Sequence, residues 1–430
     1  MNISRRRFIL NTGLAAGALA VPTIIPSCVR GANDKINLVM IGVGDHGMTW
    51  NLPAYLKLDD CRVVAVSDVD LTRARKAKKI IDDHYQNQDC QIFHDFREVL
   101  ARKQFDAVQI STPDHWHVPM SVLAIQAGKD VCCEKPTHTI NQGRILCDVV
   151  ARHDRVYQTS LEDRSLFPYH RMAELARNGR IGKIQKIVCG LPGAYNLRYQ
   201  ANDFTVQQPP KEFFYDMWLG PAPEAPYSPG RCHWNFRWIF DYSGGSICDW
   251  GSHIIDTAQR ALGTEKSGPV SVEGTGIFGT EGLYNTAHTY RLIYEYESGA
   301  VMEVHSEKVE IRIEGTDGWL YVNGWNGKLE ASSEEILNSE IGSNEIHLST
   351  DQSEHANFLK CIRSRAETYH PVEDVHRNST IAHMGNIAMI LGRKLHWDVQ
   401  KEEFVNDAEA NSMRSKPERD PWKLEDLVNI

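Results

Sequence analysis

A glycine-rich turn after an apolar run constrains the fold of this chain more than any other feature of the sequence. The run at residues 35–41 reads KINLVMI, a composition typical of a strand buried in a parallel sheet. Three glycines follow in the spacing G-x-G-x-x-G, which permits a tight turn, a close approach of the backbone to a pyrophosphate, and packing of the next helix. The turn predicts a dinucleotide site with contacts at Gly42, Val43, Gly44, Asp45, His46 and Gly47.

A carboxylate follows the glycines at the distance that ribose binding requires. Residues 62–67 (RVVAVS) have the composition of a second strand, and Asp68 comes directly after them, about 20 residues past the turn. A carboxylate there accepts hydrogen bonds from both ribose hydroxyls and repels a 2′-phosphate, so NAD is expected rather than NADP. Arg73 and Arg75 follow closely and keep NADP as the less favoured alternative.

Two further apolar runs, at residues 105–110 and 130–133, indicate additional strands of the same sheet. Ligands of such sheets bind beyond the carboxyl ends of the strands, where the glycine turn and Asp68 also lie. We therefore expect a doubly wound parallel sheet of Rossmann type. Further cofactor contacts are expected at Thr112, Pro113, His117, Glu134 and Lys135. For His117, a structural place at the start of a helix is an alternative.

The first 33 residues have the features of an export signal. Residues 5–7 are arginines, and they precede Phe8 and an apolar run at residues 14–25. Paired arginines ahead of a phenylalanine and a short apolar run are typical of the twin-arginine route. Because the run is too short for a comfortable membrane span, we expect a periplasmic or cell-envelope protein without a transmembrane span in its mature form. Lipoprotein anchoring at Cys28 is a weaker alternative.

The second half of the chain has the pattern of a different domain. Residues 184–189, 289–296 and 301–305 alternate or run apolar, as long strands do. We expect an α+β domain with a large, open, mostly antiparallel sheet and helices on one face. The expected organisation is an export segment at 1–33, an NAD-binding Rossmann domain at 34–157, a substrate-binding and oligomerisation domain at 158–400, and a C-terminal surface extension at 401–430.

The composition argues against two classes of function. The formal net charge of -9 is carried by scattered acids, without the clustered lysine and arginine of a nucleic-acid-binding protein. The basic stretch at residues 73–79 fits a solvated helix face better than a binding patch. The ten cysteines include no C-x-x-C pair, so no metal site is expected. The expected partner is a small molecule, with no nucleic acid.

Together these motifs resemble the glucose–fructose oxidoreductase and inositol dehydrogenase family, often called Gfo/Idh/MocA. The resemblance extends from about Ile36 to Trp397. It rests on the glycine turn, Thr112-Pro113 with His117, Gly128-Lys129, Glu134-Lys135-Pro136, and a later Asp-x-x-x-His at Asp249 and His253. The segments at 218–221 (WLGP), 241–245 (DYSGG) and 249–253 (DWGSH) are similar to the exported branch of the family.

The resemblance implies that Lys135, Asp249 and His253 are the catalytic residues, with Lys135 beside the nicotinamide. It implies a carbohydrate or cyclitol hydroxyl as the substrate, and a homo-oligomer, a dimer or tetramer, formed through the free face of the second sheet. Some exported members resemble enzymes that oxidise the 3-hydroxyl of glycosides. A distant branch cleaves N-acetylgalactosaminides with bound NAD, and we rank it lower because the DWGSH element is not typical of it.

The three implied residues have complementary chemistry for oxidising an alcohol. An unperturbed histidine pKa of about 6.5 suits His253 to accept the hydroxyl proton, and the Lys135 ammonium stabilises a developing alkoxide. Asp249 lies four residues before His253, so on one helix Asp249 would orient the imidazole or hydrogen-bond the substrate. Candidate substrate contacts are Arg164, His233, Trp234, Arg237 and Trp238, with core packing as an equal alternative for the aromatic residues.

Three functions remain open from the sequence. The first is an NAD-dependent oxidoreductase that acts on a hydroxyl of a sugar, glycoside or polyol. The second is a glycoside-cleaving or lyase enzyme that uses catalytic NAD in a redox-elimination route. The third is a non-catalytic NAD-holding envelope protein, against which the complete set of Lys135, Asp249 and His253 argues. Because free NAD is scarce outside the cytoplasm, an exported enzyme is expected to hold its cofactor tightly and recycle it.

Overall fold

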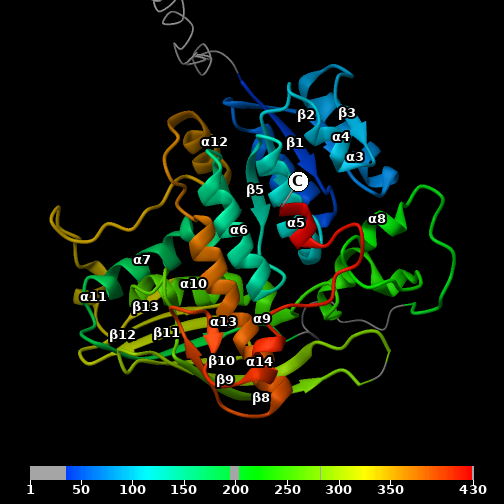
Figure 1. Ribbon diagram of the computed structural model, residues 1–430. Helices are drawn as coiled ribbons and strands as arrows, with labels where there is room; N and C mark the ends of the chain where they lie inside the picture. The colour runs from blue at the N-terminus through cyan, green and yellow to red at the C-terminus, as the bar shows by residue number, and fades with distance from the viewer. Residues whose placement is uncertain (1–34, 194–202, 281, 429–430) are drawn as a thin grey trace, which may run out of the picture. The chain divides into compact units, whose positions relative to one another are not determined.

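Two β-sheets organise the chain in a computed structural model that describes residues 35–193, 203–280 and 282–428 (Figure 1). The predicted export segment and Cys28 lie outside the described residues. Among the residues that are described, no helix is long and apolar enough to cross a membrane.

The first sheet is parallel and has six strands in the order β3-β2-β1-β4-β5-β6. The strands are β1 (Ile36–Ile41), β2 (Cys61–Ser67), β3 (Gln91–Phe93), β4 (Ala107–Ile110), β5 (Asp130–Glu134) and β6 (Tyr157–Ser160). Strands β4 and β5 are buried at every residue, because helices cover both faces of such a sheet. The predicted Rossmann sheet is confirmed, and its last strand runs past residue 157.

Helices connect these strands and position the site. They are η1 (Gly47–Asn51), a π-helical turn, α2 (Leu52–Leu56), α3 (Leu71–Tyr85), α4 (Phe96–Leu100), α5 (Asp114–Gln126) and α6 (Ile140–Arg152). Asp70 caps α3, since its carboxylate accepts the backbone N–H groups of Thr72 and Arg73. The basic stretch at 73–79 therefore lies on a helix, and its exposed Lys79 pairs with Asp83 at 2.7 Å.

The second sheet has nine strands in the order β13-β12-β11-β7-β10-β9-β8-β14-β15. Its pairs are antiparallel except for the parallel pair β7 and β10, which confirms the mostly antiparallel prediction. Its strands are β7 (Ile184–Gly190), β8 (Ser271–Phe278), β9 (Ala287–Glu295), β10 (Val301–His305), β11 (Glu310–Gly315), β12 (Trp319–Asn323), β13 (Leu329–Ala331), β14 (Leu395–Asp398) and β15 (Glu403–Phe404).

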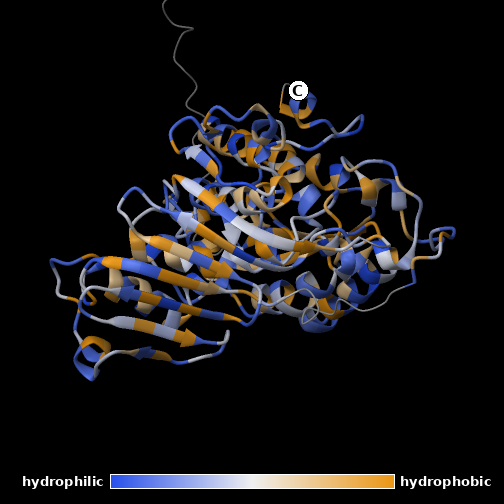
Figure 2. Cartoon of the chain, turned by 90° about the horizontal axis from the view of Figure 1, so that it is seen from below, coloured by the Kyte–Doolittle hydropathy of each residue, from blue (hydrophilic) through white to orange (hydrophobic). Residues whose placement is uncertain are grey.

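One face of the second sheet is covered by helices α7 (Phe167–Arg177), α10 (Gly251–Leu262) and α13 (Val372–Leu391) (Figure 1). Apolar and polar residues alternate along its strands, as Figure 2 shows, because successive side chains of a strand point to opposite faces. The remaining short helices are η2 (Glu162–Arg164), α8 (Tyr215–Leu219), η4 (Pro229–Arg231), η5 (His233–Trp238), α9 (Ser246–Asp249), α11 (Glu334–Asn338) and α14 (Ala408–Ser412).

Two segments from the C-terminal half complete the core around the first sheet. Helix α12 (Glu354–Ser364) buries Phe358 and Leu359 in one core cluster with residues of β1 and β2. The last helix in the described part of the chain is α15 (Leu424–Val428), and Trp422 just before it packs on Trp116 with ring centroids 4.8 Å apart. Most described residues of the predicted surface extension at 401–430 are at least partly exposed, and Trp422 is buried against the first sheet.

Candidate functional site

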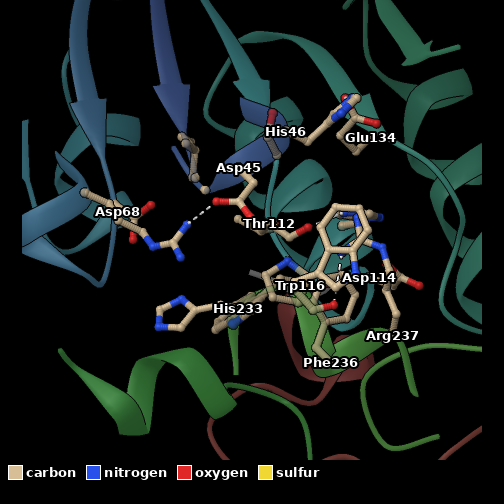
Figure 3. A pocket seen from close by; sticks show the side chains of 18 of the residues that line it. Asp45, His46, Asp68, Thr112, Asp114, Trp116, Glu134, His233, Phe236 and Arg237 are labelled. Carbon is tan, nitrogen blue, oxygen red and sulfur yellow. Dashed lines mark hydrogen bonds and ion pairs between the residues drawn. The ribbon is translucent and has the colours of Figure 1, made fainter. Parts of the chain in front are cut away.

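A cavity of about 410 Å³ opens at the carboxyl ends of the strands of the first sheet. Its wall is completed by the segment 213–253 and by the turn between β12 and β13. Figure 3 shows side chains from the glycine turn, from the ends of the parallel strands and from the segment around residue 236 pointing toward one another. The cavity therefore lies where the order of the parallel strands reverses, between β1 and β4, as expected for a doubly wound sheet.

The glycine turn has the backbone geometry that a pyrophosphate cradle requires. Gly42 has φ +84°, and a Cβ there would lie 2.5 Å from the carbonyl oxygen of Ser111, so only glycine fits. A Cβ on Gly44 would have only the tip of Arg73 within 4 Å, at 3.4 Å, because this residue lines the open cavity. Of the six predicted turn contacts, Val43 and Gly47 are buried and do not line the cavity.

Asp68 lies at the end of β2 and lines the same cavity. Its carboxylate accepts the backbone N–H groups of Val43 and Asp70, both at 2.8 Å. Burial raises the pKa of Asp68 to about 6, against the lowering effect of these hydrogen bonds. Arg73 pairs weakly with Asp45 at 3.4 Å and with Asp70 at 3.5 Å, as Figure 3 shows for Asp45. The guanidinium of Arg73 thus lies between two carboxylates, those of Asp45 and Asp70.

Lys135 and Asp249 form the central ion pair of the site. The Lys135 Nζ lies 2.6 Å from Asp249 Oδ1, and Arg237 Nε lies 3.2 Å from Asp249 Oδ2. Burial lowers the pKa of Lys135, but the charges of Asp249 and Glu134 outweigh burial and raise it. Burial raises the pKa of Asp249, while Lys135 and Arg237 lower it well below its usual range. The Asp249 carboxylate is thus shared between two cations, Lys135 and Arg237.

His253 also lines the cavity, but a different carboxylate holds its ring. The Nδ1 atom lies 3.1 Å from Asp163 Oδ1, and no hydrogen bond joins the ring to Asp249. Helix α9 ends at Asp249 and α10 begins at Gly251, so the two residues do not share one continuous helix. The expectation that Asp249 orients the imidazole is therefore wrong. Burial lowers the pKa of His253 to about 4, although Glu162 acts in the opposite direction.

Glu134 is anchored at the end of β5 by two side chains of the glycine-turn helix. Its Oε1 lies 3.2 Å from His46 Nε2 and accepts the Asn51 amide at 2.8 Å. Burial lowers the pKa of His46, but Glu134 outweighs burial and raises it. Asn51 in turn lies 2.8 Å from the ring of His355. Asn51 and His355 could not be predicted from the sequence, because neither residue belongs to a recognisable motif.

His117 lines the cavity, yet both of its ring nitrogens are occupied. Nδ1 lies 2.9 Å from the carbonyl oxygen of Pro136, and Nε2 lies 2.9 Å from that of Thr112. The ring therefore ties the loop after β4 to the loop after β5. This geometry favours the structural alternative that the sequence left open, in which His117 holds Thr112 and Pro136 in place.

Two of the five predicted substrate contacts do not reach the cavity. Arg164 is buried and pairs with Asp256 and Asp374, at 2.8 Å and 2.9 Å, because a guanidinium inside a protein requires carboxylate partners. Trp238 is fully buried in the core cluster that contains Trp218. The structure brings the other three to the cavity wall, namely His233, Trp234 and Arg237.

The cavity also contains aromatic and acidic residues that the sequence did not single out. Trp325 lies in the turn between β12 and β13, with its ring centroid 4.9 Å from His253 and 5.6 Å from Trp250. Glu162 lies beside His253, with Oε2 4.0 Å from Nδ1. Trp325 stands 72 residues after His253, so only the pairing of the second sheet brings them together.

A backbone strap covers the side of the cavity next to Asp68. Phe213 forms a β-bridge with Asp70, the Leu71 N–H donates to the Glu212 carbonyl at 3.0 Å, and the Phe214 N–H donates to the Val69 carbonyl at 2.9 Å. Arg75 and Glu212 add a bidentate ion pair at 2.6 Å and 2.7 Å. These contacts hold residues 212–214 against the loop that follows β2.

The parallel sheet and its glycine turn define a Rossmann-type oxidoreductase that binds a nicotinamide dinucleotide. Residues 36–161 match a family model described as the oxidoreductase family, NAD-binding Rossmann fold, and residues 170–424 match the model of its C-terminal alpha/beta domain. Because these matches cover most of the chain, the protein belongs to the Gfo/Idh/MocA oxidoreductase family, as the motifs predicted.

Curated relatives match parts of the chain. A glycosyl hydrolase family 109 protein of Stenotrophomonas maltophilia is 36% identical over 140 residues, 31% of this chain and 29% of that protein. The D-glucoside 3-dehydrogenase of Escherichia coli is 26% identical over 168 residues, 37% of this chain and 46% of that protein. An inositol 2-dehydrogenase of Saccharopolyspora erythraea is 27% identical over 154 residues, 35% and 44% respectively. Each match thus spans less than half of the relative.

Solved structures share the fold over a longer span. The aldose-aldose oxidoreductase of Caulobacter crescentus, complexed with glycerol, aligns with a TM-score of 0.62 and 16% identity over 84% of this chain and 100% of that one. The WlbA dehydrogenase of Bordetella pertussis, in complex with NADH and UDP-GlcNAcA, aligns with a TM-score of 0.63 and 15% identity over 85% and 99%. These likenesses establish the fold.

Proposed function

We propose that this protein oxidises or reduces a hydroxyl of a sugar, glycoside or polyol, with NAD as a tightly held cofactor that is recycled on the enzyme. The observation that carries the proposal is that Lys135, Asp249 and His253 line the same cavity as the glycine turn and Asp68. An ammonium, a neutral imidazole and a dinucleotide cradle are the groups that alcohol oxidation needs.

The cavity residues fit a dinucleotide. Gly44 leaves the backbone open toward the cavity, which suits it to a pyrophosphate. Asp68 would accept the ribose hydroxyls of the adenosine half, and its negative charge disfavours a 2′-phosphate, so NAD is proposed over NADP. When bound, the nicotinamide accepts the hydride that leaves the substrate carbon.

The chain's own residues supply the proton chemistry. Lys135 would donate a hydrogen bond to the reacting oxygen, and its ammonium charge would stabilise an alkoxide formed there. His253, whose pKa is lowered to about 4 chiefly by burial, is uncharged near neutral pH and can accept the hydroxyl proton. The Trp250 and Trp325 rings next to His253 offer apolar faces to a sugar ring.

Tight retention of the cofactor would suit an exported enzyme. The strap at residues 212–214 hydrogen-bonds to the loop after β2, so a dinucleotide beside Asp68 would leave only when the strap opens. We propose that the protein is exported to the periplasm or cell envelope, as its N-terminal sequence indicates. Retention fails as a proposal if purified protein loses its dinucleotide on simple dialysis.

The first experiment is a mass spectrum of the small molecules that denaturation releases from purified protein. We expect NAD in about one equivalent per chain, and release of NADP or of no dinucleotide would contradict the cofactor assignment. A panel of glycosides and polyols then follows reduction of the bound cofactor by its absorbance. A panel without any response would contradict the proposed function.

Lys135→Ala tests whether the protein is an enzyme or an NAD-holding binding protein. We expect reduction of the bound cofactor to fall at least about 100-fold, because the ammonium no longer stabilises the alkoxide. Lys79→Ala is the matched control, since its side chain is 75% exposed on α3. A binding protein would be indifferent to both changes.

A second candidate function is glycoside cleavage through a transient oxidation. Its support is that relatives named glycosyl hydrolase family 109 proteins match the N-terminal part of this chain. The two candidates need the same cofactor and the same Lys135. They differ in the outcome, since a net oxidoreductase accumulates reduced cofactor with its substrate, whereas a cleaving enzyme restores NAD and releases the leaving group.

We also propose a homo-oligomer, a dimer or tetramer, formed through the outer face of the second sheet. That face carries exposed apolar side chains among its charges, with Ile277 59% and Ile293 38% exposed. Light scattering of the purified protein tests the proposal, and a monomer at micromolar concentration would contradict it.

A further inference from the structure

The imidazole of His253 is held from behind by a buried carboxylate. Its Nδ1 lies 3.1 Å from Asp163 Oδ1, and the two side chains are only 7% and 1% exposed. The ring lines the cavity, and its Nε2 has no hydrogen-bond partner among the described residues. The imidazole therefore has one nitrogen toward Asp163 and one available to a substrate hydroxyl.

The side chain of Asp163 makes its hydrogen bond to this ring. It lies in η2, between β6 and α7, where the adjacent Arg164 is occupied by Asp256 and Asp374. Its Oδ2 is buried without a partner in the described part of the chain. Among the residues that the structure describes, the side chain of His253 is thus the one that hydrogen-bonds to this buried carboxylate.

We propose that Asp163 is a positioning residue that fixes the ring of His253 and receives its Nδ1 proton when the substrate is oxidised. The proposal rests on the proposed function. In the step, the substrate O–H bond breaks and its proton joins Nε2, while the Nδ1–H bond breaks and that proton joins Asp163 Oδ1. The C–H electron pair leaves as the hydride that the cofactor accepts. The ring stays neutral and changes tautomer, and reduction reverses each transfer.

The surroundings of the pair favour this route over a charged imidazole. Burial lowers the pKa of His253 to about 4, whereas burial, followed by the charge of Asp256, raises the pKa of Asp163 well above its usual range. Burial thus disfavours a charged imidazole, and Asp163, at hydrogen-bond distance from Nδ1, is placed to take the Nδ1 proton. The titratable groups that face the pair are Glu134, Lys135, Glu162, Arg164, Asp249, Asp256 and Arg260.

The tautomer of His253 tests the proposal without any substrate. Long-range ¹⁵N–¹H spectra of histidine side chains separate the two neutral tautomers and the imidazolium, and His253→Gln identifies the signal. At alkaline pH, which favours the ionised carboxylate of Asp163, we expect wild-type protein to carry the proton on Nδ1. An imidazolium, or a proton on Nε2, would overturn the proposal.

Variants then separate positioning from general electrostatics. In Asp163→Ala the Nδ1 proton loses its acceptor, so we expect the ring to shift toward the Nε2–H tautomer. Glu162→Gln is the matched control, because it removes a carboxylate 4.0 Å from Nδ1 without a hydrogen bond, and we expect the Nδ1–H tautomer to persist. A wild-type tautomer in Asp163→Ala, or the same shift in both variants, would refute the assignment.

Kinetic measurements test whether Asp163 contributes to the reaction. For any sugar or polyol that reduces the wild-type cofactor, we expect Asp163→Asn to slow the reduction by about 100-fold with little change in half-saturation. An equal rate in Asp163→Asn would count against the relay. If no panel compound reduces the cofactor, the proposed function fails, while the spectra still report on the pair.

Discussion

At the scale of single residues, the site combines groups that could be predicted from the sequence with groups that could not. Lys135 and Asp68 follow apolar strands directly, so their place at the strand ends could be predicted from the pattern. The residue that hydrogen-bonds to His253 could not be predicted from the sequence. The spacing of four residues pointed to Asp249, but α9 ends at Asp249 and α10 begins only at Gly251, so the two side chains do not lie on one continuous helix. Asp163 and Trp325 approach His253 only through the tertiary fold.

Asp68 gives a prediction about pH. Because burial raises its pKa to about 6, the carboxylate becomes neutral as the pH falls through that value and then accepts ribose hydroxyls less well. We expect NAD affinity, measured by calorimetry on dinucleotide-stripped protein, to weaken below about pH 6. Asp68→Asn should bind NAD weakly and without this pH dependence, whereas Asp45→Asn, with a side chain 54% exposed, should retain it.

In the cofactor-free protein, the ionisation of Asp68 has the opposite effect on folding stability, which falls as the pH rises, whereas NAD affinity rises. The pKa of Asp68 in the folded state, about 6, lies above the pKa of about 3.9 of an unperturbed aspartate, so its favourable contribution is complete below the lower pKa and is lost as the pH rises through about 6. Bound NAD would reverse this loss. A cofactor-independent pH profile of unfolding would contradict the placement of Asp68 at the ribose.

At the scale of elements, the strap at 212–214 is predicted to set the rate of cofactor release. Phe213 is 6% exposed, lines the cavity and bridges to Asp70, so Phe213→Ala should loosen the cover over the dinucleotide. We expect NAD to dissociate about tenfold faster, a cost of about 1.4 kcal/mol in the barrier. The measurement is the loss of bound-cofactor fluorescence on dilution.

Val206→Ala provides the control for the strap. Val206 precedes the strap in the sequence and is 65% exposed, so its truncation removes apolar atoms without opening the cavity. Its release rate should equal that of the wild type. Equal acceleration in both variants would mean that the strap does not gate release.

At the scale of the whole molecule, the parallel and antiparallel character of the two sheets could be predicted, but not all of the segments that pack on them. Runs of apolar residues gave the parallel strands, and alternation gave the antiparallel ones. The packing of α12 and α15 on the first sheet could not be predicted in the same way, because apolar residues such as Phe358 and Trp422 indicate a buried face but not the sheet that it contacts. Their position depends on contacts with residues far earlier in the chain.

The packing of Trp422 leads to a prediction about the unfolding free energy of the nucleotide-binding domain. It is 6% exposed and packs against Trp116 and Phe96, so Trp422→Ala should cost about 3–5 kcal/mol of unfolding free energy and lower the thermal midpoint. Phe167→Ala removes a ring that is 71% exposed, and we expect almost no change. Equal midpoints in calorimetry would contradict the packing of the C-terminal segment.

The return of the last helix to the first sheet has a consequence for biosynthesis. A ribosome completes the six parallel strands long before it reaches Trp422 and Leu424, which close the apolar cover beside them. The nascent nucleotide-binding domain therefore stays partly uncovered until the segment that contains Trp422 and Leu424 has been synthesised.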